Sequence, residues 1–254
     1  MKLIFFFLIF VLTNLSSQAR KVGETEITTD EGIEVFQKEK YYLLKKNVNI
    51  QSDTFTLSGD QVEIFFEKDL YDIKIIDAVG SVKLKSHEYN IDSSGEKLIL
   101  EIEKELINVI GIDSILIIEN TNMYSDGKIQ VNNINGNFFI IGKNSKLISE
   151  DILIEGEYID GIFSTIDGVR DINILNVEDK LTAYVKTEDT EMYANNVKYN
   201  REISLIELID NVKIIRDGET ITGDYGTLDT KTNSYKVKSN NTKKVKVIIS
   251  DTDE

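Results

Sequence analysis

The side chains that could carry catalysis or bind a metal are few in this 254-residue sequence. There is one histidine, His87, and there is no cysteine. A zinc site built from several histidines and a cysteine nucleophile are therefore both excluded. His87 lies in the segment Lys85–Glu88 and lacks the strand–turn–helix surroundings of a nucleophilic serine. The sequence therefore predicts no catalytic residue.

Acidic residues offer two other possibilities, a carboxylate pair and a calcium loop. Asp60 and Asp224 each follow a glycine in two similar segments. Aspartate beside glycine commonly bonds nearby backbone, so we expect both to be turn and strand-start residues. Asp126–Gln130 lacks the alternating acidic ligands of a calcium loop. We expect no metal, no cofactor and no enzymatic activity; a carbohydrate-active β-solenoid with carboxylates clustered on one face is the enzymatic alternative.

The first residues have the pattern of a secretory signal. Met1-Lys2 is positively charged, Leu3–Leu12 is an unbroken apolar run, and small residues precede the bond after Ala19. The alternative is an uncleaved membrane anchor, but an apolar run this short falls below the roughly 20 residues that a spanning helix needs. We predict a signal peptide at residues 1–19 and a mature domain at residues 20–254.

Composition limits the partners of the mature chain. Asp and Glu number 44 against 29 Lys and Arg, and the formal net charge is −15. Such a surface repels nucleic acid and anionic membranes, so we expect no nucleic-acid partner. The sequence has no cysteine and no proline. Stability must therefore come from the core and from backbone pairing, and the absence of proline suits a chain of paired strands.

Alternation of polar and apolar residues runs along most of the chain. This period of two, with β-branched and aromatic residues, predicts half-buried strands. It is seen in Asn47–Ile50, Thr54–Leu57, Gln61–Ile64, Ser81–Leu84 and Lys244–Val247. Dipeptides that favour tight hairpin turns lie between such stretches, at Asp126-Gly127, Asn135-Gly136, Asp160-Gly161, Asp167-Gly168 and Asp217-Gly218. The sequence therefore predicts an all-β protein.

Internal repeats sharpen that prediction. Asn47–Asp60 and Asn211–Asp224 are identical at seven of fourteen positions without gaps, and Ser58–Asp77 and Ser94–Asp113 match at seven of twenty. Each unit contains a Gly-Asp strand start, a turn and an Asn-Val or Ser-Val strand. Repetition on this scale indicates units that bury their apolar faces against their neighbours. The middle, about residues 114–190, is strand-like but diverges from the unit.

These units resemble the OstA-like family of lipopolysaccharide transport proteins. An Ala-Asp or Gly-Asp strand start is matched by Thr29-Asp30, Gly59-Asp60 and Gly223-Asp224. Lys46-Asn47-Val48 and Asp210-Asn211-Val212 resemble the Gly-Asn-Val strand of the family, without its glycine. The chain also departs from the family in its length and its divergent middle.

The resemblance implies a fold and a function. The fold is an antiparallel open β-jellyroll of short hairpin units, V-shaped in section. The function is that of a periplasmic carrier of lipopolysaccharide (LptA-type), one segment of a bridge between the two membranes that holds the lipid A acyl chains in its apolar interior. The implied partners are LptC-like and LptD-like proteins and further copies joined head to tail. The alternatives are an LptC-like component of the same system and a non-enzymatic β scaffold.

The alternating pattern identifies a candidate lipid-binding face. Its members are the apolar residues of the repeats: Val48, Ile50, Phe55, Leu57, Val62, Ile64, Phe66, Val82, Leu84, Val212, Ile214 and Ile221. Alternation defines a face but leaves open whether that face lines a trough or packs as an ordinary core. We expect the terminal strands near Glu26–Phe36 and Lys244–Ile249, where unpaired edges would join copies strand to strand.

Overall fold

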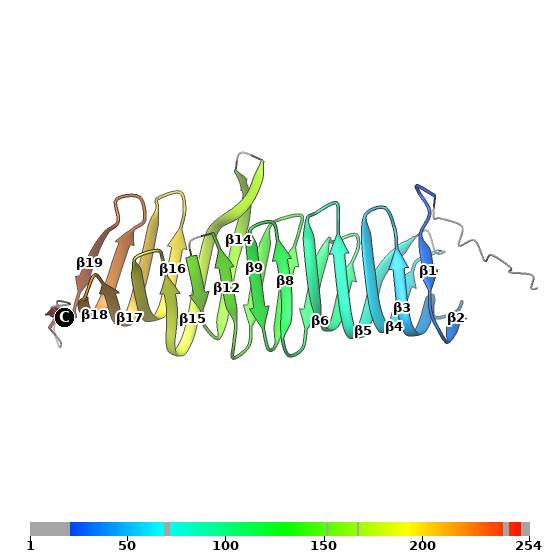
Figure 1. Ribbon diagram of the computed structural model, residues 1–254, viewed down its shortest axis with the longest axis horizontal. Coiled ribbons are helices and arrows are strands. Elements are labelled where there is room, and N and C mark those ends of the chain that lie inside the picture. Colours follow the sequence, from blue (N-terminus) through cyan, green and yellow to red (C-terminus); the bar gives the residue numbers. More distant parts are fainter. Residues whose placement is uncertain (1–20, 69–71, 151, 167, 241–243, 250–254) are drawn as a thin grey trace, which may run out of the picture.

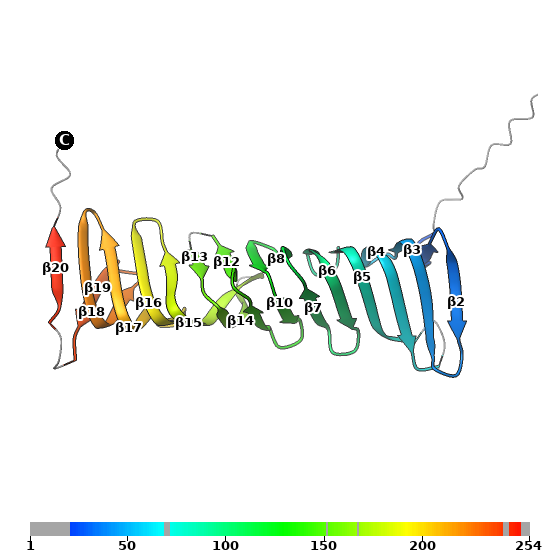
Figure 2. The ribbon, with the colours of Figure 1, turned by 90° about the horizontal axis from the view of Figure 1, so that it is seen from below.

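The computed structural model describes residues 21–68, 72–150, 152–166, 168–240 and 244–249. The predicted signal peptide at residues 1–19 lies outside these ranges. The molecule is elongated, its strands run across the long axis, and the first and last described strands lie at opposite ends (Figures 1 and 2). Among the described residues, no helix is long and apolar enough to cross a membrane.

The described chain is a succession of antiparallel strands, as the alternating pattern predicts, and it forms one 20-stranded sheet. The strands are β1 (Glu26–Thr28), β2 (Gly32–Phe36), β3 (Tyr41–Gln51), β4 (Phe55–Phe66), β5 (Ile73–Ser86), β6 (Ile91–Glu101), β7 (Leu106–Ile110), β8 (Ser114–Ile118), β9 (Thr121–Ser125), β10 (Lys128–Asn132), β11 (Asn137–Ile141), β12 (Lys146–Ser149), β13 (Ile152–Glu155), β14 (Tyr158–Ile166), β15 (Val169–Lys186), β16 (Thr190–Asn200), β17 (Leu205–Arg216), β18 (Glu219–Asp229), β19 (Ser234–Lys238) and β20 (Lys246–Ile249).

This sheet folds along its length into two walls. The first wall runs in the order β2, β3, β4, β5, β6, β7, β10, β11, β14, β15, β16, β17, β18 and β19. The second runs in the order β1, β3, β4, β5, β6, β8, β9, β12, β13, β15, β16, β17, β18 and β20. The long strands belong to both walls, because each bends where its register shifts. We call the line of bends the corner and the opposite, hairpin-bearing border the mouth.

The sequence repeats mark the corner. β3 bends at Lys46 and Asn47, whose φ angles are 66° and 51°, and β17 bends at Asp210 and Asn211, with φ angles of 63° and 53°. These are the residues that precede the Val48 and Val212 of the two repeats. A pair of left-handed residues turns the strand without ending it, because pairing resumes on the other side of the bend.

One prediction about these repeats is wrong. Gly59-Asp60 and Gly223-Asp224 do not start strands; they lie inside β4 and β18, at the corner. Glycine suits position 59 because a Cβ there would lie 3.3 Å from the carbonyl oxygen of Val79 on the neighbouring bend, which is a tight contact. Asp224 accepts hydrogen bonds from the hydroxyl of Ser239 at 2.8 Å and the N–H of Asn240 at 2.7 Å. These acceptors join one bend to the next rather than closing a local turn.

The middle segment crosses the corner differently. Here the chain leaves one wall at the end of a short strand and enters the other at the start of the next, as from β7 to β8 and from β11 to β12. Two of these crossings share a Gly-x-x-Ser sequence. The hydroxyl of Ser114 donates to the carbonyl of Gly111 at 2.8 Å, and the hydroxyl of Ser145 donates to that of Gly142 at 2.9 Å. The divergent middle therefore continues both walls with different corners.

The predicted hairpin turns have mixed outcomes. Asp217-Gly218 joins β17 to β18 with φ angles of 48° and 78°, as expected for the two left-handed residues of this turn, and Asn135-Gly136 lies between the paired strands β10 and β11. The prediction of a turn at Asp160-Gly161 is wrong, because these residues lie inside β14 and pair with β11. Asp126-Gly127 forms a corner crossing between β9 and β10, which do not pair. Gly168 lies in the β14–β15 hairpin, and residue 167 is outside the described ranges.

Candidate functional site

The candidate lipid-binding face lies in the interior, between the two walls. Ten of its members are buried, Phe66 and nine that belong to one contiguous core cluster: Val48, Ile50, Leu57, Val62, Ile64, Val82, Leu84, Val212 and Ile214. Phe55 and Ile221 are only partly buried. The packed-core alternative therefore describes most of these positions, and any open part of the interior has to be sought elsewhere.

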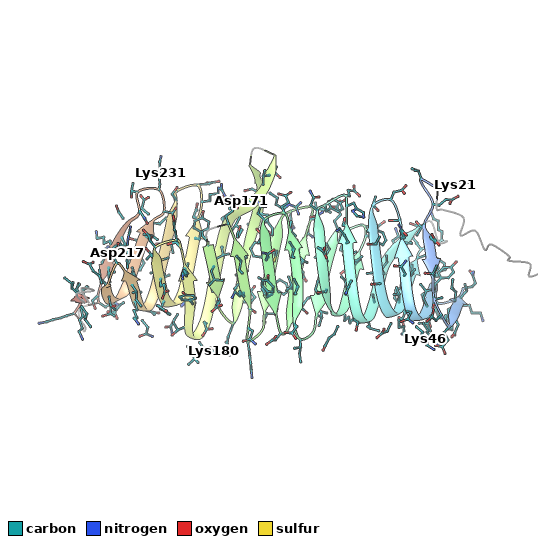
Figure 3. The ribbon with its side chains drawn as sticks, in the orientation of Figure 1. Lys21, Lys46, Asp171, Lys180, Asp217 and Lys231 are labelled. Carbon is teal, nitrogen blue, oxygen red and sulfur yellow. The ribbon has the colours of Figure 1, made fainter. Side chains whose placement is uncertain are left out.

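Two cavities open the interior at the mouth. The first has a volume of about 580 Å³ and is lined by residues of β12, β13, β15, β16 and β18 and of the turns that follow β12, β15, β16 and β18. Its floor is apolar and consists of Ile152, Ile154, Ile172, Leu175, Tyr199 and Leu228. Its rim carries hydroxyl and charged groups from turns of both walls. Figure 3 shows two rim residues, Asp171 and Lys231, at the upper border of the molecule, and the corner residues Lys46 and Lys180 at the lower border.

The second cavity is smaller and more apolar. Its volume is about 190 Å³, and it lies between β4–β5 on the second wall and β6–β7 on the first. Its apolar lining is formed by Phe55, Leu84, Tyr89, Leu100, Ile102, Leu106 and Ile107. Phe55 and Leu84 are the two members of the predicted face that line a cavity. Of these two cavities, the predicted face therefore lines only the second.

The β14–β15 hairpin crosses the mouth between the two cavities. It projects beyond the other turns (Figure 1). The N–H of Arg170 donates to Glu119 Oε2 at 2.8 Å, in the β8–β9 turn of the second wall, and its guanidinium donates to Asn133, in the β10–β11 turn of the first. Asp171 then borders the first cavity and Asn133 the second. One arginine therefore links both walls and separates the two openings.

A second link closes the far side of the first cavity. Arg216 of the second wall donates to Asp189 at 2.6 Å and to the carbonyl oxygen of Asn233 on the first wall at 2.9 Å. The amide of Asn233 also donates to Asp189, at 3.0 Å. The hydroxyl of Thr190 holds the pKa of Asp189 below its ordinary value, and Asn233 and Arg216 act in the same direction. This carboxylate therefore stays charged, and the first cavity lies between two polar links across the mouth.

None of the residues that line the first cavity was among the sequence-based candidates. Ile152 and Ile154 carry a period-two signal, and Leu175 lies on the same face of its strand as the buried Val177. Their periodicity is visible in the sequence. The sequence does not give the pairing register of the strands in the middle segment, so it could not place these residues at the mouth. Leu228 sits at the end of the C-terminal repeat, beyond the segment that the repeats align.

The residues considered for chemistry are not brought together. His87 is exposed in the β5–β6 turn. Asp60 lies in β4, which pairs with β3 and β5, whereas Asp224 lies in β18, which pairs with β17, β19 and β20. Within the described ranges, no group of three or more His, Cys, Asp or Glu side chains could hold a metal ion.

The two ends of the sheet carry the predicted edge strands. β1 and β2 both pair with β3, and β19 and β20 both pair with β18. Apolar side chains are exposed there: Ile33 (50%) and Val35 (47%) at one end, and Val247 (51%) and Ile249 (70%) at the other. The predicted positions of the terminal strands are confirmed.

Comparisons with known proteins found similarity among solved structures and gave two negative results. No protein-family model matches the chain, and no curated protein matches it. Among solved structures, the chain is similar to LptH from Pseudomonas aeruginosa, described as the LptA homologous periplasmic component of the conserved lipopolysaccharide transport device. The two are 11% identical, the match covers 89% of this chain and 95% of that one, and the TM-score is 0.22. At this TM-score the similarity carries no weight for function.

Proposed function

We propose that this protein is a non-enzymatic carrier of lipopolysaccharide, or of an amphipath built like it, that acts in the periplasm. The observation that supports the proposal is the first cavity, which has an apolar floor beneath a polar rim. Its volume of about 580 Å³ falls within the roughly 300–1,000 Å³ of ligand sites. An acyl chain on that floor would be removed from water while its head group stays at the rim.

The energetics favour such a ligand. Each buried CH₂ group contributes about 0.8 kcal/mol, so about six methylenes suffice for roughly 5 kcal/mol before the cost of association. The second cavity offers a smaller apolar site on the other side of Arg170, next to Phe55 and Leu84. A chain that exceeds one cavity would have to pass the Arg170 link to reach the next.

The exposed ends of the sheet support a place in a larger assembly. Each end presents unpaired strand edges beside exposed apolar residues, such as Val35 at one end and Val247 at the other. A second copy, or an LptC-like or LptD-like partner of the same fold, would add strands there and cover the apolar residues. Because the two ends are different surfaces, the contact would be head to tail and would not close.

The experiment is lipid extraction from the purified mature protein, followed by mass spectrometry and site-specific photocrosslinking. A photoreactive phenylalanine analogue replaces Tyr199, which lines the first cavity, or Tyr193 of the same strand. Tyr193 is the matched control because it alternates with the buried Met192 and Ala194 and packs against Tyr184, with the ring centroids 5.0 Å apart. Lipid attached at position 199 but not at position 193 is the expected result.

One observation favours a second candidate, a structural scaffold without a ligand. Ten of the twelve residues of the predicted face are buried in the packed core. If no lipid is extracted and neither position crosslinks, the carrier is ruled out and the scaffold stands.

A further inference from the structure

We infer that the first cavity selects an amphipath with an uncharged, hydroxyl-rich head group, such as a sugar, over one with a phosphate head. The inference rests on the proposed function, because it names the ligand class of the same cavity. It starts from the rim, whose charges do not favour an anion. Carboxylates of four residues line the cavity, Glu150, Asp171, Glu188 and Asp189, against the cations of Arg201 and Lys231.

The cations at the rim are already engaged. Arg201 forms an ion pair with Asp171. Arg216, which lies beside the rim, is held by Asp189 and by the carbonyl oxygen of Asn233. A phosphate would have to compete with these carboxylates for each guanidinium. It would also lie among the negative charges of the rim, which repel it.

Lys231 offers little compensation. It follows Asp229, whose pKa is lowered first by the backbone N–H of Thr232 and also by the charge of Lys231. Its charge thus already acts on a carboxylate at the same turn. The rim as a whole therefore remains acidic, and the formal net charge of −15 for the chain repels anions over longer distances.

The uncharged groups of the rim suit hydroxyls. Hydroxyl or amide side chains line the cavity from both walls, Ser149 at the end of β12 and the others in turns: Thr187, Ser204, Thr230 and Asn233. Burial raises the pKa of Tyr199, and the charge of Glu150 raises it further, so the phenol keeps its proton as a donor. The exposed carboxylates of Glu150 and Glu188 accept from hydroxyl donors, in hydrogen bonds that are stronger for being charge-assisted. A sugar supplies both donors and acceptors to this set.

The test compares three amphipaths that share one alkyl chain. Dodecyl maltoside, dodecyl phosphate and dodecyltrimethylammonium are titrated calorimetrically into the mature protein below their micelle concentrations. We expect the maltoside to bind at least tenfold more tightly than the phosphate. In the double variant E150K/E188K, the ratio of the dissociation constants of the phosphate and the maltoside should fall at least tenfold. Glu39→Lys changes an exposed carboxylate outside both cavities and should leave this ratio unchanged. Circular dichroism confirms that each variant is folded.

The possible failures separate the inference from the function on which it rests. Phosphate binding as tight as that of the maltoside in the unmodified protein overturns the inference and leaves the carrier standing. Tightest binding of the ammonium compound also overturns it, because the rim would then select positive charge alone. If none of the three amphipaths binds, the proposed carrier function itself is rejected. If E150K/E188K and Glu39→Lys change the ratio of phosphate to maltoside affinity equally, the selectivity does not arise in the cavity and the inference is rejected.

Discussion

In the outer repeats, strands such as β3 and β17 pass from one wall to the other without interruption, whereas between β7 and β14 the chain makes the same crossing through short loops. The outer bends use left-handed residues that have side chains, such as Lys46 and Asn211. The middle crossings use glycine and a buried serine, as at Gly142 and Ser145. The two regions thus build the same cross-section by different local means.

The two regions bear different energetic costs, backbone strain in the outer bends and buried carbonyl groups in the middle crossings. A residue with a Cβ in the left-handed region costs about 1–2 kcal/mol, which the outer bends bear and their continuous pairing offsets. The middle crossings avoid much of that strain, but they bury loop carbonyls that need a donor. Ser114, Ser125 and Ser145 supply hydroxyls to the carbonyls of Gly111, Ile141 and Gly142.

The largest expected effect tests whether the two regions share one core. Leu116 in the middle and Ile214 in an outer repeat are 0% and 1% exposed. An aspartate at either position buries an unpaired carboxylate, so each variant should lose about 4 kcal/mol or more in urea unfolding. Phe55→Asp, at the second cavity, is the control and should lose less than half as much, because its carboxylate can reach water. A loss below about 1 kcal/mol for Leu116→Asp would show that the middle is not part of the core.

A smaller effect tests the glycine at a middle crossing. Gly142 has a φ of 153°, and a Cβ there would lie 2.8 Å from the backbone nitrogen of Gly127. Gly142→Val should therefore cost about 3 kcal/mol, measured by the same unfolding curves. Gly168→Val is the matched control: its φ is 82° and nothing lies within 4 Å of its Cβ, so it carries the backbone strain alone. Equal losses would mean that close packing of neighbouring crossings is not the constraint.

The serine hydroxyls come next in size. Ser145 is 1% exposed, and Ser145→Ala leaves the Gly142 carbonyl without this donor, at a cost of about 1 kcal/mol. Ser81→Ala, at an exposed outer bend, should change stability by less than about 0.5 kcal/mol. The comparison between the regions fails if both substitutions have the same effect.

The smallest effect has the opposite sign. Lys46 is exposed and has a φ of 66°, so Lys46→Gly removes left-handed strain while adding freedom to the unfolded chain. The net result should be a gain of about 0.5 kcal/mol. Lys83→Gly, at an exposed position within β5 where no left-handed conformation is required, should lose about the same amount. A loss at both positions would show that the outer bends carry no strain.

Sequence reasoning recovered the strands and the inner face because alternation records which side of a strand is buried. It misplaced Gly59-Asp60 because glycine and aspartate are rare inside strands, and a bend within a strand has the same composition as a strand start. Asp160-Gly161 misled for a similar reason: the glycine inside β14 leaves room for the ring of Phe138 on β11.

The site was harder to predict than the fold. Whether the interior is open depends on how far apart the walls stand at the mouth, which turns and the β14–β15 hairpin determine. Arg170 lies 51 residues from Glu119 and 37 from Asn133, and no local pattern reports such a contact. The Gly-x-x-Ser spacing that begins at Gly111 and at Gly142 is visible in the sequence. It would have identified two corner crossings of the middle segment.

The regular order of strands in both walls has a consequence for length. Apart from the edges, each passage of the chain from mouth to corner to mouth adds one strand to each wall, at about 4.8 Å along the axis. The cross-section does not depend on the number of passages. Duplicating or deleting a pair of passages would therefore lengthen or shorten the molecule along its axis without any change to its interior. Its span, rather than its shape, is the property that insertions in such a gene would change.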